Sequence, residues 1–89
     1  MKGFTVTWHP EAEDELVRIW INFGDRRRIT QAVARIDNEL AEEPARCGEA
    51  VREGVRSLSV PPLRVLFVVR PDDRLAEVLM VSVLAGSVE

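Results

Sequence analysis

Three arginines stand at spaced positions in the most strongly strand-like part of the chain. Arg56, Arg64 and Arg70 lie between residues 55 and 70, where most of the other residues are apolar and typical of β-strands. A guanidinium group is costly to remove from water unless it gains a hydrogen-bonded or charged partner. Each arginine therefore either pairs within the fold or faces outward toward an anion such as a phosphate.

Other candidates for chemistry are few. His9 is the single histidine, and its place beside Pro10 at an expected helix start predicts a capping or packing residue. Cys47 is the single cysteine, so it excludes an internal disulfide, and no second metal ligand lies nearby in the sequence. The acidic residues at 11–15 are typical of a helix N-terminus. We expect no metal and no cofactor.

Length and composition indicate one folded domain over residues 1–89. The chain is 46% hydrophobic and 30% charged, as in an ordinary globular protein. No apolar run approaches the roughly 20 residues that a membrane helix requires. Strand-like alternation begins at Phe4, so we expect no signal peptide. A lone cysteine suits a reducing compartment, so we expect a cytoplasmic protein with no membrane partner.

The charge is unevenly distributed. The net charge of −3 argues against a general nucleic-acid-binding protein, yet residues 50–74 are net positive and eleven of the twelve basic residues are arginines. A short basic run at an expected helix start is a candidate for phosphate contact, although an exposed turn is the simpler interpretation. The candidate RNA- or target-binding residues are Arg70, Arg52, Arg26, Arg27 and Arg28.

Periodicity predicts the elements that hold these arginines. Residues 4–8 alternate as a strand, and Pro10 suits the first position of a helix that ends near Gly24. Its apolar stripe at helical spacing, Trp20 included, is expected to pack on the core. Asp25 is a plausible N-cap for a second helix over residues 26–43. Three strands are expected at 53–60, 63–70 and 75–84, after a loop at 44–52.

The order β-α-α-β-β-β predicts an α+β fold, an antiparallel meander with an N-terminal strand and a helical hairpin on one face. Within residues 63–70, an apolar set should face the helices, which puts Arg64 and Arg70 on the open face. The face of Arg56 depends on the turn at Pro61-Pro62. A two-residue turn puts Arg56 on the helix side, and a longer turn or a bulge puts it on the open face. The cost of burying it unpaired favours the open face.

The chain resembles the RelE/ParE superfamily of bacterial type II toxins. The resemblance is carried by the element order, the opening run Val6-Thr7-Trp8-His9-Pro10-Glu11-Ala12, the pair Arg56-x-Leu58 and the strand Leu63-Arg64-Val65-Leu66-Phe67. It implies a small toxin neutralised by an antitoxin protein. RelE-like members cleave mRNA at the ribosome, and ParE-like members inhibit DNA gyrase. By the same resemblance Arg64 and Arg56 are the candidate catalytic residues.

The chain also departs from the RelE-like pattern. It contains no tyrosine, Phe67 stands where many relatives carry one, and residues 83–89 include no arginine, tyrosine or histidine. RNA cleavage benefits from a group that accepts a proton as well as a cation that stabilises the phosphorane. Three functions therefore stay open: an mRNA endoribonuclease, a gyrase inhibitor, and a member that only binds its antitoxin. We expect the antitoxin to contact Val17 and Ile21 on the first helix.

Overall fold

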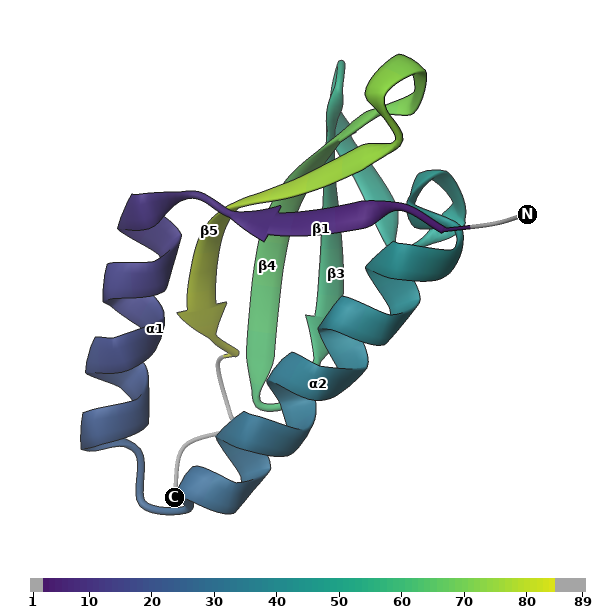
Figure 1. Ribbon diagram of the computed structural model, residues 1–89. Coiled ribbons are helices and arrows are strands. Elements are labelled where there is room, and N and C mark those ends of the chain that lie inside the picture. The colour runs from purple at the N-terminus through teal and green to yellow at the C-terminus, as the bar shows by residue number, and fades with distance from the viewer. Residues whose placement is uncertain (1–2, 85–89) are drawn as a thin grey trace.

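A computed structural model describes residues 3–84 as a five-stranded sheet with two long helices (Figure 1). The elements are β1 Thr5–Trp8, α1 Pro10–Asn22, α2 Arg26–Glu42, a 3-10 turn Pro44–Arg46, β2 Glu49–Arg52, β3 Val55–Val60, β4 Leu63–Arg70, a 3-10 turn Pro71–Asp73 and β5 Leu75–Val83. The strand order is β1-β5-β4-β3-β2. β1 runs parallel to β5, and the other neighbours are antiparallel. The predicted α+β class is confirmed.

Both helices begin where the sequence predicts. Pro10 is the first residue of α1, and Nδ1 of His9 accepts the backbone N–H of Glu11 at 3.1 Å, so His9 is the predicted capping residue. Asp25 caps α2 by accepting the backbone N–H of Arg28 at 3.3 Å. Only residues 23–25 join the helices, which diverge from this connection in Figure 1.

The core lies between the helices and one face of the sheet. Phe67 of β4 is completely buried, and so are Ile36 and Leu40 of α2 and Val78 of β5. Burial of each such side chain contributes about 1.5–3 kcal/mol. Val65 and Phe67 face the helices as predicted, whereas the side chains that alternate with them lie on a sheet face that neither helix covers.

β2 lies in the stretch that we expected to be a loop. All four of its residues are exposed, so no alternation of apolar and polar residues marked it as a strand. Gly48, which precedes it, has a φ of +63°, and a Cβ there would collide with the carbonyl oxygen of Ser57 in β3. Glycine therefore allows the chain to leave the helical layer and pass close against β3.

The register of β3 against β4 corrects our expectation for Arg56. Val60 pairs with Leu63 across the two-residue turn, so Arg56 lies opposite Phe67 and on the helix side of the sheet. The expected open-face position was wrong because the guanidinium group is not left unpaired there. The carbonyl groups that follow α2 accept its hydrogen bonds, which removes the penalty that favoured the other face.

No helix within residues 3–84 is both long enough and apolar enough to span a lipid bilayer.

Candidate functional site

Arg64 occupies the centre of a polar row on the open face of the sheet. The register places it directly opposite Ser59 of β3 on one side and Ser82 of β5 on the other. Residues paired in this way have Cβ atoms about 4.5–5.5 Å apart and point to the same face. Arg64 is partly buried, and both serines are exposed. The row therefore presents one guanidinium group between two hydroxyl groups.

Arg64 is distinctive because its charge is not satisfied internally. Within residues 3–84, its guanidinium group has no hydrogen-bond or ion-pair partner. The next row along the sheet holds Leu66, with Ser57 opposite on β3 and Met80 opposite on β5. Met80 is 59% exposed. The open face thus combines a cation, hydroxyl groups and an exposed apolar side chain, which suits binding an anionic group beside an apolar one.

Arg56 and Arg70, by contrast, have partners within the protein. Arg56 donates from Nε to the carbonyl oxygen of Cys47 at 2.9 Å and from Nη2 to that of Gly48 at 3.2 Å. Nη2 of Arg70 lies 3.6 Å from Oε1 of Glu77. The Arg70 side chain is exposed and that of Glu77 is partly buried, and such an ion pair at the surface contributes about 1 kcal/mol at most. Of the three strand arginines, Arg64 is therefore the one that the fold leaves available for a ligand.

The basic run lies at the connection of the two helices, in the first turn of α2. Arg26 places Cζ 4.5 Å from the ring centre of Trp20 and donates from Nε to the carbonyl oxygen of Trp20 at 3.2 Å. It thus serves the C-terminal end of α1, which has no basic residue in its own last turn. Arg28 stacks against Phe23, with 5.9 Å from Cζ to the ring centre. Arg27 is exposed at this connection, and Arg52 is exposed on edge strand β2.

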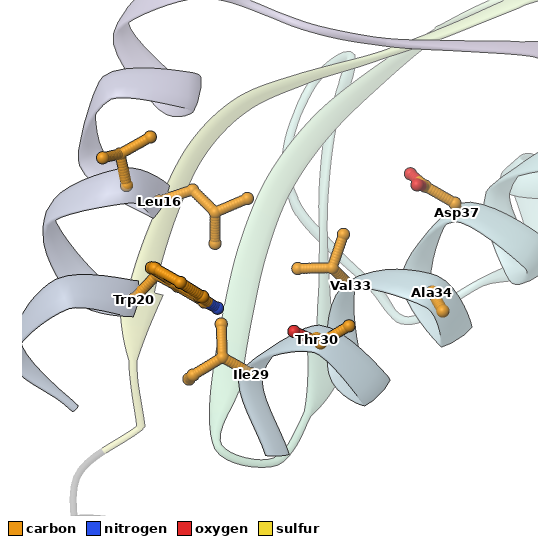
Figure 2. Close-up of a pocket in the computed structure, with 8 residues that line it drawn as sticks. Leu16, Trp20, Ile29, Thr30, Val33, Ala34 and Asp37 are labelled. Atoms are coloured by element: carbon orange, nitrogen blue, oxygen red, sulfur yellow. The ribbon is translucent and has the colours of Figure 1, made fainter. Parts of the chain in front are cut away.

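A second candidate site is an apolar groove of about 440 Å³ between α1 and α2 (Figure 2). Most of its lining side chains are apolar, whereas Thr30 and Asp37 are polar. The lining comprises Leu16, Val17 and Trp20 from α1 and Ile29, Thr30, Val33, Ala34 and Asp37 from α2. We call this site the α1/α2 groove. Its size and apolar surface suit side chains of a partner protein.

Sequence reasoning anticipated the groove only in part. Val17 lines it and Ile21 does not, although each is 55% exposed. Trp20 was expected to pack on the core, but it is 40% exposed and forms a groove wall. The available signal was the width of the apolar surface on α1, since Val17 and Ile21 extend it beyond the residues that a single core-facing stripe requires.

Asp37 is held at the groove by a contact with the first strand. Its Oδ1 accepts a hydrogen bond of 3.0 Å from Nε1 of Trp8. This bond joins β1 to α2 and fixes the carboxylate, which is partly buried. Figure 2 shows the Asp37 carboxylate apart from the apolar cluster of Leu16, Trp20 and Ile29. One end of the groove therefore carries a fixed negative charge.

Cys47 is a structural residue in this arrangement. Its Sγ donates toward the carbonyl oxygens of Glu39 at 3.3 Å and Glu43 at 3.4 Å, near the end of α2. Burial raises the pKa of the Cys47 thiol, and the nearby Glu39 carboxylate adds to this. The thiolate is thus disfavoured, which opposes a nucleophilic role. Across residues 3–84, no group of three or more His, Cys, Asp or Glu side chains is arranged to hold a metal ion.

Comparison with known proteins agrees with this architecture. One similar solved chain comes from the toxin–antitoxin complex RelBE2 of Mycobacterium tuberculosis, at 23% identity over 96% of this chain and 95% of that chain, with a TM-score of 0.79. Another comes from the chromosomal ParDE system of P. aeruginosa, at 18% identity over 91% and 96%, with a TM-score of 0.64. The comparison with curated proteins gives no match. The profile of the ParE toxin of the type II toxin–antitoxin system parDE matches residues 6–87. The chain therefore belongs to the ParE toxin family of type II toxin–antitoxin systems.

Proposed function

We propose that this toxin-family protein arrests bacterial growth by inhibiting DNA gyrase and is neutralised by an antitoxin that docks in the α1/α2 groove. The observation that carries the proposal is the guanidinium group of Arg64 on the sheet face that neither helix covers, which has no partner within residues 3–84. A partly buried cation between two hydroxyl groups can bind an anionic group of a macromolecular target. Such binding supports recognition of a target and requires no catalysed reaction.

A proton acceptor is the component that the Arg64 row lacks. Attack by a ribose 2′-hydroxyl group benefits from a base beside the stabilising cation. The sequence contains no tyrosine, and the single histidine, His9, uses Nδ1 to accept the N–H of Glu11 at the start of α1. The serines of the row are poor bases at neutral pH. Gyrase inhibition needs no such group, so the family match and the residues at the row favour the same function.

Cleavage of mRNA on the ribosome is the second candidate. The Ser59–Arg64–Ser82 row favours it, because a guanidinium group flanked by hydroxyl groups could also hold a phosphodiester. The third candidate is a protein that binds its antitoxin but no longer arrests growth, which the net charge of −3 favours over a nucleic-acid-binding protein.

Expression of the whole chain from a tightly controlled promoter separates these three functions. The host is a bacterium that carries no gene for the antitoxin. Gyrase inhibition predicts growth arrest with a DNA-damage response and intact mRNA. Cleavage predicts growth arrest with mRNA broken soon after induction. Unimpeded growth at a protein level verified by immunoblot would contradict both toxic activities.

The contribution of Arg64 is tested by Arg64→Ala. The variant should arrest growth more weakly while it accumulates to the same level, because the guanidinium group makes no hydrogen bond or ion pair with the residues that the structure describes. The matched control is Arg46→Ala, which removes a guanidinium group that is 85% exposed and lies in the turn after α2. Undiminished growth arrest by Arg64→Ala would show that Arg64 is not part of the target-binding site.

The partner site is tested by co-purification with the cognate antitoxin. Val17→Asp places a charge in the apolar lining and should abolish capture, and Ile21→Asp should weaken it from the adjoining exposed surface. Val51→Asp is the control, since Val51 is 43% exposed on β2 and lies outside the groove. Full capture by the Val17→Asp variant would show that the antitoxin docks elsewhere.

A further inference from the structure

The two ends of the α1/α2 groove carry opposite charges. Asp37 lines the groove toward the later part of α2, and Glu13 lies one turn before Leu16 and Val17 on α1. The short connection brings the end of α1 to the start of α2, so Glu13 and Asp37 belong to the end farther from that connection. At the near end, Arg26 stacks on Trp20, and Arg27 lies one turn before Thr30. The far end is acidic and the near end is basic.

The charged residues at the ends of α2 do not follow the arrangement that stabilises a helix. An α-helix is stabilised by acidic residues in its first turn and basic residues in its last turn, by about 0.3–1 kcal/mol each. The first turn of α2 holds no acidic residue and its last turn no basic residue. Arg26 is accounted for by its contacts with Trp20. Within residues 3–84, Arg27 has no such contact, so helix stability does not explain its presence at this end.

A partner that covers the groove must compensate the negative charge of Asp37. It is partly buried, and one of its oxygens already accepts the hydrogen bond from Trp8. A partner that covers it removes more water from the remaining carboxylate oxygen. This is unfavourable unless the partner supplies a cation. A partner with an acidic side chain at this end would lose more affinity than a partner that packs poorly there.

We infer that the segment occupying the α1/α2 groove is an amphipathic helix with basic side chains at the Asp37 end and acidic side chains at the Arg27 end. The inference rests on the proposed function only in identifying the owner of this helix as the antitoxin. From Ile29 to Asp37 the lining spans about 12 Å along α2. That length matches about two turns of the partner, which present apolar anchors at positions i, i+3 or i+4, and i+7.

The experiment uses two synthetic helical peptides and the full-length protein. Both peptides carry the same apolar stripe and the same number of lysines and glutamates. The bipolar peptide has its lysines at one end and its glutamates at the other, whereas the scrambled peptide mixes them along its length. Binding is followed by tryptophan fluorescence, because Trp20 lines the groove. A Trp20→Phe variant shows how much of the signal comes from that residue.

We expect the bipolar peptide to bind about tenfold more tightly than the scrambled peptide at low salt, and the preference to shrink as salt increases. Asp37→Asn keeps an oxygen that can accept the hydrogen bond from Trp8 but removes the charge, so it should reduce the preference severalfold. Arg27→Glu should reduce it as well. Val51→Asp, outside the groove, should leave it unchanged.

The outcomes separate the polarity from the docking site. Equal affinity for the two peptides would overturn the polarity while leaving the groove as a docking site. If neither peptide changes the Trp20 signal, the groove itself is wrong as the partner site, and the polarity falls with it. Neither result bears on growth arrest, which the expression experiment measures separately.

Discussion

Arg56 and Arg64 lie on neighbouring strands, but their guanidinium groups have different surroundings. Arg56 makes two hydrogen bonds to carbonyl oxygens, at 2.9 Å to Cys47 and 3.2 Å to Gly48, whereas Arg64 makes none within residues 3–84. Replacement by methionine keeps most of the aliphatic stem and removes the guanidinium group. The same substitution at the two positions therefore compares a structural arginine with one available to a ligand.

The expected loss of stability follows from the geometry of the Arg56 contacts. A hydrogen bond to a charged group contributes about 1.5–3 kcal/mol when it is sheltered from water. The bond from Nε is partly buried and should lie in that range, while the bond from Nη2 is exposed and contributes less. We expect Arg56→Met to lower the free energy of unfolding by about 2–3 kcal/mol. Arg64→Met should change it by less than about 0.5 kcal/mol, because the guanidinium group has no hydrogen-bond or ion-pair partner among residues 3–84.

Urea denaturation followed by tryptophan fluorescence measures both changes. With an m-value of about 1 kcal/mol per molar urea for a domain of this size, Arg56→Met should lower the urea midpoint by about 2–3 M at unchanged m. Arg64→Met should leave the midpoint in place and weaken growth arrest. The reasoning is refuted if Arg56→Met keeps full stability but loses toxicity, since that result would put Arg56 at the target rather than at the turn after α2.

The other predictions concern Gly48, Asp37 and Cys47. Gly48→Ala should destabilise the fold by about 2–4 kcal/mol, measured by thermal unfolding, because it adds left-handed strain to a collision with the Ser57 carbonyl group. Asp37→Ala leaves the indole N–H of Trp8 without its acceptor, so it should cost about 1–3 kcal/mol, whereas Asp37→Asn should cost less. Burial raises the pKa of the Cys47 thiol above its ordinary value of 9.0, so alkylation should be slower than for a free thiol. The contribution of Cys47 to stability should be complete below pH 9.0 and decline as the pH rises through the folded-state pKa, which a Cys47→Ser variant would not show.

Local patterns predicted most of the fold because each element carried its own signal. Pro10 and Asp25 marked the starts of the two helices through backbone preferences and capping, which depend on neighbouring residues alone. The alternation around Phe67 identified the buried face of β4, and with it the open position of Arg64. The predicted elements form because hydrophobic burial and helix capping favour the same helices and strands here.

The rest depended on contacts between residues distant in the chain. β2 has four exposed residues and pairs with β3 only after Gly48 redirects the chain, so its own composition did not identify it. The face of Arg56 depended on two carbonyl acceptors that lie eight and nine residues earlier in the chain. The sequence argument assumed that a guanidinium group on the helix side would be unpaired, because it gave no sign of these acceptors. Trp20 matched a core position by spacing, yet the divergence of the helices left it at the groove.

The two candidate surfaces lie on opposite sides of the sheet, and this bears on how neutralisation would work. The α1/α2 groove is on the side that buries Phe67, and Arg64 points to the other side. A helix of about two turns in the groove would not reach the Arg64 row. If both proposals hold, an antitoxin that occupies only the groove anchors the complex without covering Arg64. Neutralisation then requires a second segment that crosses an edge of the sheet, or a target that also needs the helical face.

Edge strand β2 is short and is interrupted by a register shift, so it is poorly suited to pairing with such a segment through its backbone. Side-chain contacts with the Arg64 row would have to hold the segment.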